Sequence, residues 1–190
     1  LTSYFHPLRP EMASHPYVES RIVSEQQALA MNGPDFRVVV LQPPYVFGVV
    51  PGRQSIGDSM NAFSWLPLPL PAGGTNAMSV MALAKAIVGA VEGEARGTYL
   101  VGDENLSWGA LFKRFGGTSL PLPTFVLRAV MILGKIVLGV ARRESGLDPV
   151  KLVDTMTSEM FFDPSEGQAV LGYEGGDLDQ AIADIKQRKG

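Results

Sequence analysis

Apolar positions along the chain recur with two different periods, and together they predict a mixed α/β fold. The run Phe36–Leu41 is apolar and rich in valine, which is typical of a parallel strand buried on both faces. The apolar spacing within Asn76–Gly89 predicts a helix, and Thr98–Val101 predicts a second short strand. The apolar stripe of the helix consists of Leu83, Ile87, Val88 and Val91.

Start and stop signals delimit the helices. We expect one helix from Pro16 to about Met31, because proline suits a first helical turn and Asn32-Gly33-Pro34 is a strong stop signal. Ser79 is the candidate cap of the helix in Asn76–Gly89, and Ser107 should cap a helix that ends at about Phe115. Two further helices are expected at Asp148–Thr157 and Leu178–Lys186.

The segment Phe125–Ala141 is apolar enough to suggest a membrane span. Arg128 and Lys135 interrupt it, however, and it is shorter than the roughly 20 residues that a bilayer requires. We therefore expect a buried or partly buried helix here. The alternative is a segment that lies on a membrane surface or contacts a lipophilic ligand.

Composition and charge exclude several classes of function. The 190 residues suffice for one sizeable domain or for a core with a small appendage, and the net charge of -3 gives nucleic-acid binding no electrostatic support. The absence of cysteine excludes disulfides and thiolate metal sites. His6 and His15 lack metal-ligand spacing with the scattered acids, so no metal is expected. Because no segment resembles a signal peptide, we expect a soluble cytoplasmic protein.

Tyr17 and Arg21 are the candidate catalytic pair. They lie four residues apart in the predicted helix and should therefore share one of its faces. A free tyrosine has a pKa of about 10, and a neighbouring positive charge favours its ionised form, which suits the pair to proton transfer. The same spacing is compatible with an ordinary amphipathic surface helix that carries a half-buried tyrosine.

The order of elements after this helix points to a known family. A Gly33-Pro34 break is followed by the apolar strand and its proline-rich end, FRVVVLQPPYVFG. This order resembles the second half of the short-chain dehydrogenase/reductase superfamily, in its extended epimerase/dehydratase-like branch, where a Tyr-x-x-x-Lys helix precedes an Arg-Pro-x-x-Val-x-Gly-like loop. FFDPSEGQAVLGYE also resembles the near-terminal Asp-x-Ser-x-Ala-x-x-x-Leu-Gly-Tyr signature of that branch. The resemblance implies the C-terminal portion of a Rossmann-like parallel sheet with a small, mostly helical α/β substrate domain.

The resemblance also implies roles for individual residues. Tyr17 would exchange a proton with a substrate hydroxyl or carbonyl, and Arg21 would replace the lysine that holds the nicotinamide ribose. Ser3 would hydrogen-bond the reacting oxygen, unless it is an ordinary turn serine. The backbone at Pro44 and Val46, in the Pro43–Gly48 loop, would line the nicotinamide ring.

Three positions depart from the family pattern. Arg21 keeps the charge of the expected lysine but not its compact geometry, because a planar guanidinium cannot replace an ammonium at a close ribose contact without rearrangement. Gln42 stands where arginine is common, and Ala82 stands where an aspartate usually begins the helix.

NAD or NADP is the cofactor that the resemblance implies, yet no glycine fingerprint opens a strand-to-helix unit in this sequence. We therefore interpret the chain as part of a longer protein. Residues 1–48 would be the remnant of a dinucleotide-binding domain and residues 49–190 the substrate-binding part, with residues 76–101 returning to the sheet. A small-molecule substrate and a homodimer through the tyrosine helix are expected.

Two hypotheses of different kinds follow. The first is an NAD(P)-dependent oxidoreductase or epimerase/dehydratase of the extended short-chain dehydrogenase type, acting on a lipophilic alcohol or ketone as the apolar segment suggests. The second is a non-catalytic relative that binds a dinucleotide as a sensor or assembly subunit, which the departures at Arg21, Gln42 and Ala82 favour.

Overall fold

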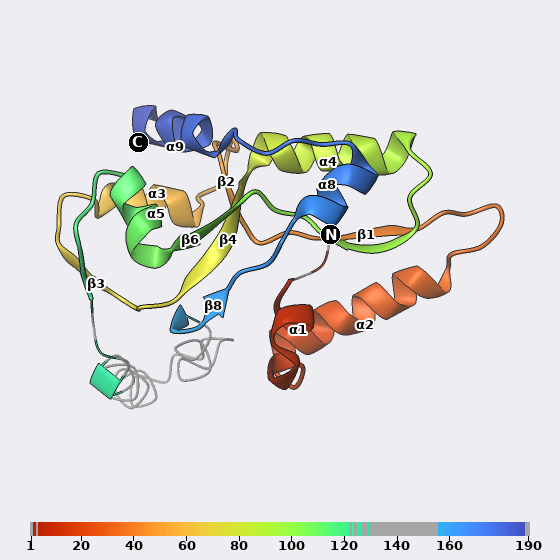
Figure 1. Ribbon diagram of the computed structural model, residues 1–190, viewed down its shortest axis with the longest axis horizontal. Helices are drawn as coiled ribbons and strands as arrows, with labels where there is room; N and C mark the ends of the chain where they lie inside the picture. The colour runs from red at the N-terminus through yellow and green to blue at the C-terminus, as the bar shows by residue number, and fades with distance from the viewer. Residues whose placement is uncertain are drawn as a thin grey trace. The chain divides into compact units, whose positions relative to one another are not determined.

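The computed structural model describes residue 2, residues 4–121, residues 123, 125, 126 and 129, and residues 156–188. The chain divides into two compact units (Figure 1). Unit 1 comprises residues 1–58, 76–105 and 162–190, and unit 2 comprises residues 59–75 and 106–161. The functional division into residues 1–48 and 49–190 stays a prediction.

Unit 1 is built on short parallel strands. β1 (Val39–Gln42) pairs with β5 (Gly97–Leu100), with Val39 opposite Gly97 and Gln42 opposite Leu100. β2 (Tyr45–Phe47) pairs in parallel with the last residues of β4 (Gly74–Ser79). Parallel pairing needs a helical crossover between strands. The α/β class expected from the sequence is therefore confirmed.

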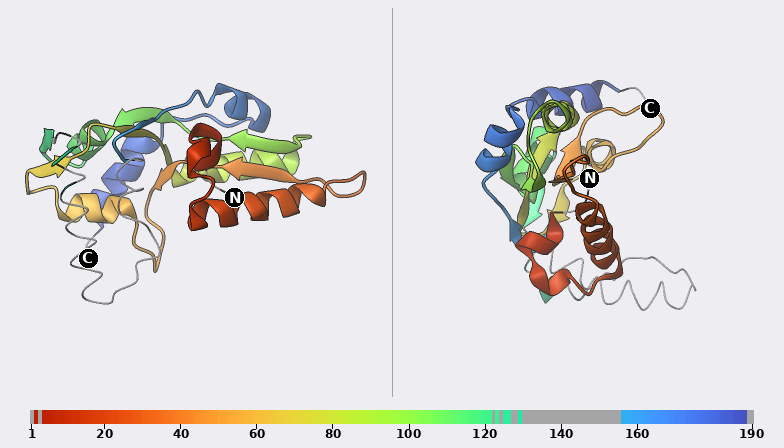
Figure 2. Two further views of the ribbon diagram at one scale, coloured as in Figure 1. Left: turned by 90° about the horizontal axis from the view of Figure 1, so that it is seen from below. Right: turned by 90° about the vertical axis from the view of Figure 1, so that its right-hand side faces the viewer.

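Two long helices cover opposite faces of the β1–β5 pair, α2 (Pro16–Ala30) on one side and α4 (Val80–Glu92) on the other (Figures 1 and 2). Successive side chains of a strand point to opposite faces. Leu41 accordingly packs in the main apolar cluster with α4, whereas the next residue, Gln42, bonds to α2. The cluster comprises Leu41, Met78, Ala82, Leu83, Ala86, Ala95, Val101, Leu171 and Tyr173.

Side-chain caps begin the long helices where the sequence predicts. The His15 side chain accepts a hydrogen bond from the backbone N–H of Tyr17 at 3.3 Å, and Pro16 occupies the first turn of α2. Ser79 Oγ accepts from the N–H of Ala82 at 2.8 Å at the start of α4, so serine supplies the cap without the usual aspartate.

The remaining helices of unit 1 include the predicted C-terminal ones. They are α1 (Phe5–Leu8), the 3₁₀ helix η1 (Pro10–Met12), α8 (Ser165–Leu171) and α9 (Leu178–Gln187). Gly172 ends α8 at φ 62°, a left-handed conformation that glycine adopts without cost. Tyr173 can then turn into the core, where its hydroxyl donates to the Gly102 carbonyl at 3.0 Å and accepts from the Gly102 N–H at 2.9 Å. Leu171 and Tyr173 of the segment FFDPSEGQAVLGYE therefore lie in the main apolar cluster.

Unit 2 has its own apolar interior. β3 (Leu68–Leu70) pairs in parallel with β7 (Ser119–Pro121), and β8 (Glu159–Met160) pairs with Gly74 and Thr75 of β4. Ser107 caps α5 (Trp108–Arg114) as predicted. The most buried apolar residues of this unit are Trp108, Leu111, Phe112, Phe115 and Met160. The division between the units falls within α3 (Ile56–Ala62), β4 and β6 (Glu104–Ser107).

The predicted strand Phe36–Leu41 is placed too early in the sequence. β1 begins at Val39, because the N–H of Val38 donates to Asn32 Oδ1 at 3.1 Å and the Phe36 side chain is exposed. Pro43–Gly48, expected to be a loop, contains the short strand β2, because its backbone pairs with β4, a segment distant in sequence.

Two predicted helices, Phe125–Ala141 and Asp148–Thr157, lie largely outside the described residues. In the part of the chain that the structure describes, none of the helices has the length and apolar character needed to cross a bilayer. The same part contains no group of three acidic or histidine side chains that could hold a metal ion.

Candidate functional site

Tyr17 and Arg21 lie together at the exposed start of α2. The guanidinium carbon of Arg21 lies over the Tyr17 ring, 5.1 Å from its centre, which is a cation–π arrangement. Tyr17 is 40% exposed, so its hydroxyl is accessible to a ligand. Among the described residues Arg21 has no hydrogen-bond acceptor, which leaves its N–H groups available as well.

The charge of Tyr17 affects the residue that follows Pro44. Burial raises the pKa of Tyr45, and the negative charge of ionised Tyr17 raises it further. The Tyr45 ring meets the buried Tyr4 ring edge-on, with 6.4 Å between their centres.

The structure places the other candidate residues as follows. Pro44 is buried in the turn between β1 and β2. Val46 packs its side chain against the main apolar cluster, so only its backbone remains for the predicted contact with a nicotinamide. Ser3 lies outside the described residues, but the N–H of its neighbour Thr2 donates to the Leu41 carbonyl at 2.9 Å, so Thr2 lies alongside β1.

One buried polar pair was missed by the sequence analysis. Glu25 is only 8% exposed and Gln42 only 3% exposed, and Gln42 Nε2 donates to both carboxylate oxygens of Glu25, at 3.0 and 3.2 Å. The spacing of residues along α2 indicates that Glu25 lies on its buried face. Glu25 follows the buried Val18 by seven residues and precedes the half-buried Leu29 by four. A glutamate on the buried stripe of a helix needs partners from other elements.

A hollow of about 460 Å³ lies on the α4 side of the β1–β5 pair. Its lining consists of Arg37, Val39, Leu41, Ile87, Ala90 and Val91. The apolar stripe predicted for α4 is therefore only partly covered: Leu83 is buried, whereas Ile87 is 40% exposed and Val91 70% exposed. Apolar surface of this kind marks a site of further packing.

The described residues have the Rossmann-like α/β fold that solved nucleotide-sugar epimerases also have. Three solved structures illustrate the similarity. The crystal structure of gox2253 is 20% identical, with 89% of this chain and 54% of that chain covered and a TM-score of 0.66. A nucleoside-diphosphate-sugar epimerase from Pseudomonas aeruginosa is 19% identical, with 90% and 56% covered and a TM-score of 0.63. UDP-glucose 4-epimerase from Bifidobacterium longum, solved with NAD⁺ and UDP, is 15% identical, with 90% and 53% covered and a TM-score of 0.56.

These similarities establish the fold. The chain spans about half the length of the solved structures that it matches, which is consistent with a C-terminal portion of such a protein. No protein-family model matches the sequence, and no curated protein sequence matches it either. Activity, cofactor and substrate are therefore matters of proposal.

Proposed function

We propose that the chain is the substrate-side part of an NAD(P)-dependent oxidoreductase or epimerase/dehydratase of the extended short-chain dehydrogenase type. One observation carries the proposal: the guanidinium of Arg21 lies over the ring of the exposed Tyr17 on α2, in a fold shared with nucleotide-sugar epimerases. In an open parallel sheet, ligands bind beyond the C-terminal ends of the strands, and Pro44 follows the end of β1.

The residues present fit the nicotinamide end of a dinucleotide. When bound, the cofactor would accept or return a hydride. The Tyr17 hydroxyl would donate or accept the proton at the substrate oxygen, and Arg21 would bind a ribose hydroxyl through the N–H groups that no described residue occupies. Ser3 would hydrogen-bond the same substrate oxygen. The choice between NAD and NADP depends on residues that bind the adenine half.

The hollow on the α4 side fits the missing half of the fold. Its lining is mostly apolar, and the solved structures that share the fold extend over about as much chain again. We propose that a nucleotide-binding half covers Val39, Leu41, Ile87 and Val91, which would complete the sheet and bring the dinucleotide to the end of β1.

Nucleotide sugars are the first substrates to test, because the similar solved proteins include epimerases of such sugars. A lipophilic alcohol or ketone is the second class, and it rests on the apolar composition of Phe125–Ala141.

A homodimer through the outer face of α2 also belongs to the proposal. Val23 on that face is 45% exposed, so Val23→Glu should shift a dimer towards monomer in sedimentation velocity.

A non-catalytic dinucleotide-binding role is the second candidate, and the position of Arg21 favours it. The guanidinium lies over the ring of Tyr17, and the described contacts include no hydrogen bond between it and the Tyr17 hydroxyl. In a sensor or assembly subunit, Arg21 would bind the dinucleotide and Tyr17 would only form part of the pocket wall.

One experiment separates the two candidates. Full-length protein is titrated with NADH and NADPH, and turnover of a panel of nucleotide sugars and lipophilic alcohols is assayed for wild type, Tyr17→Phe and Tyr99→Phe. Tyr99→Phe is the matched control, because the Tyr99 hydroxyl bonds only to the Arg96 carbonyl among the described contacts, at 3.0 Å. An enzyme loses at least about 100-fold in turnover with Tyr17→Phe alone. Dinucleotide binding without turnover supports the second role, and absence of binding refutes both.

A further inference from the structure

We infer that Glu25 is a positioning residue: its buried hydrogen bonds hold the helix that carries Tyr17 against the strand that leads to Tyr45. The inference rests on the proposed role of Tyr17, because a positioning residue acts only through another group. It concerns a side chain that has no contact with the site itself.

Glu25 joins α2 to three other segments of unit 1. Its Oε2 accepts from Thr2 Oγ1 at 2.9 Å and from Gln42 Nε2 at 3.0 Å. Its Oε1 accepts from Gln42 Nε2 at 3.2 Å and from Thr98 Oγ1 at 3.3 Å. The N-terminal segment, β1 and β5 are therefore all bonded to one side chain of the tyrosine helix.

The direct donors to this carboxylate are all neutral. His6 Nε2 lies 3.9 Å from Glu25 Oε2, which is close enough for attraction when the imidazole is protonated but too far for a hydrogen bond. A buried carboxylate is costly unless it is hydrogen-bonded, and removal of one donor leaves the charge in place. The positions of the donors relative to Glu25 are therefore strongly specified.

The bond between Glu25 and Gln42 connects both sides of the candidate site. Glu25 lies eight residues after Tyr17, or about 12 Å along a rigid helix. Gln42 is the last residue of β1 and is followed by Pro43 and Pro44, whose fixed backbone angles make a stiff link to Tyr45. The contact between Glu25 and Gln42 thus fixes the helix that carries Tyr17 relative to the segment that carries Tyr45.

The competing explanation is that packing alone holds the helix. Val18, next to Tyr17, is 1% exposed and could fix the start of α2 without help from Glu25. In that case Glu25 would affect only stability. The two explanations differ in what happens to the Tyr17–Tyr45 relationship when Glu25 is replaced.

The test uses the electrostatic effect of Tyr17 on Tyr45 as a measure of their proximity. Ionised Tyr17 raises the pKa of Tyr45, so Tyr17→Phe should lower the midpoint at which Tyr45 titrates. The midpoint is followed by NMR of ring-labelled tyrosine, with resonances assigned from single Tyr→Phe variants and the fold monitored by circular dichroism at each pH. The effect of Tyr17→Phe is then measured in wild type, Glu25→Leu and Glu25→Gln.

If Glu25 positions the helix, the effect should fall to less than about half in Glu25→Leu and should largely persist in Glu25→Gln, which keeps one of the two acceptor oxygens. An unchanged effect in Glu25→Leu overturns the inference in favour of packing by Val18. Should Glu25→Leu fail to fold, the exchange Glu25→Gln with Gln42→Glu restores an amide–carboxylate contact. In that case Gln42→Leu should reduce the effect of Tyr17→Phe on the Tyr45 midpoint, and the double variant should restore it. If the double variant does not restore it, the inference is wrong.

A second readout in the full-length enzyme separates this inference from the proposed function. Glu25→Leu should lower kcat with little change in the KM of the dinucleotide, and Glu25→Gln should restore most of kcat. If Tyr17→Phe leaves turnover intact, the proposed function is wrong, whereas the tyrosine titration still decides whether Glu25 positions Tyr17.

Discussion

The guanidinium of Arg21 lies over the ring of Tyr17, with 5.1 Å between its central carbon and the ring centre. This arrangement keeps a positive charge beside the phenol. The planar guanidinium also covers one face of the ring. A lysine in the same place would present a compact ammonium on a flexible stem, which reaches a ribose hydroxyl without stacking.

Replacement of Arg21 by lysine should therefore raise turnover of the full-length protein, by up to about tenfold, which corresponds to ~1.4 kcal/mol in the activation free energy. The measurement is kcat across the pH range in which the protein is folded. Arg21→Gln is the control, because it removes the charge at similar length and should lower turnover. No gain for Arg21→Lys at any pH would mean that Arg21 does not limit catalysis.

Tyr173→Phe should destabilise the protein at neutral pH by about 1–3 kcal/mol, because the buried Gly102 N–H loses its acceptor and the Gly102 carbonyl keeps only the longer bond from Gln168 Nε2, at 3.4 Å. The hydroxyl also makes stability depend on pH. Burial raises the pKa of Tyr173, the nearby Asp103 charge adds to the rise, and the hydrogen bond with Gly102 opposes it. The folded state therefore holds the proton at a pH where the unfolded state releases it.

The sign of that dependence follows from linkage. The contribution of Tyr173 is fully present below the unfolded pKa of about 10 and is lost as the pH rises through the folded value. Urea unfolding between about pH 8 and 11 should show a decline in stability that is shallower in Tyr173→Phe. Tyr99→Phe, which removes an exposed hydroxyl, should leave the slope unchanged. Equal slopes for wild type and Tyr173→Phe would contradict this prediction.

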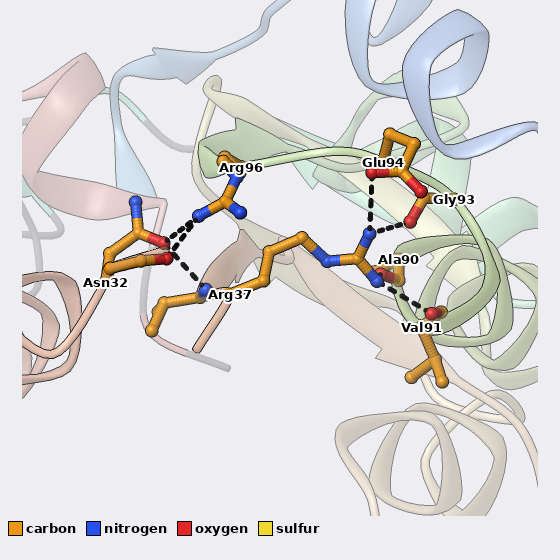
Figure 3. Close-up of polar contacts among 9 residues, drawn as sticks. Asn32, Arg37, Ala90, Val91, Gly93, Glu94 and Arg96 are labelled. Carbon is orange, nitrogen blue, oxygen red and sulfur yellow. Dashed lines mark hydrogen bonds and ion pairs between the residues drawn. The ribbon is translucent and has the colours of Figure 1, made fainter. Parts of the chain in front are cut away.

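The C-terminal end of α4 depends on a side chain from the segment before β1. The Arg37 guanidinium donates to the carbonyls of Gly93, Val91 and Ala90 and lies 3.7 Å from Glu94 (Figure 3). Carbonyls at a helix C-terminus have no intrahelical partner, and a cation there also interacts favourably with the helix dipole.

Arg37→Met should therefore lower the free energy of unfolding by about 1–3 kcal/mol while keeping the apolar stem of the side chain. Arg96→Met is the matched control, since Arg96 donates from an exposed position to Asn32 Oδ1 and the Gly33 carbonyl, both at 2.9 Å (Figure 3). Its loss should stay below about 1 kcal/mol. Equal losses in chemical denaturation would show that Arg37 acts as an ordinary surface charge.

How far the sequence predicts this structure depends on the range of the interactions involved. Pro16, Ser79 and Ser107 act within one helical turn, so the starts of α2, α4 and α5 could be predicted from neighbouring residues. β2 could not, because it forms a strand only by pairing with a partner some thirty residues away, Tyr45 lying opposite Ala77.

The candidate site shows the same limit. The pairing of Tyr17 with Arg21 follows from a four-residue spacing on one helix, and the structure contains it. Glu25 carries no local sign of its partners, because Gln42 and Thr98 come from two strands that a periodic pattern cannot bring together. A glutamate on an apolar stripe indicates only that such partners must exist.

The exposed stripe of α4 leads to a last prediction. Of the stripe that periodicity predicts on α4 only Leu83 is buried; Ile87, Val88 and Val91 are 40%, 51% and 70% exposed, and the other buried residues of α4 are Ala82 and Ala86. If a nucleotide-binding half packs in the hollow, Val91→Ser and Ile87→Ser should change the stability of the 190-residue chain by less than about 0.5 kcal/mol. In the full-length protein each of these two substitutions should cost about 1–3 kcal/mol, because the side chains are then buried.

Val88→Ser is the control, because Val88 lies on the same helix but outside the lining of the hollow, and it should cost little stability in either protein. Equal, small effects in both proteins, measured by urea unfolding, would mean that the hollow stays open and that the other half of the fold does not pack there.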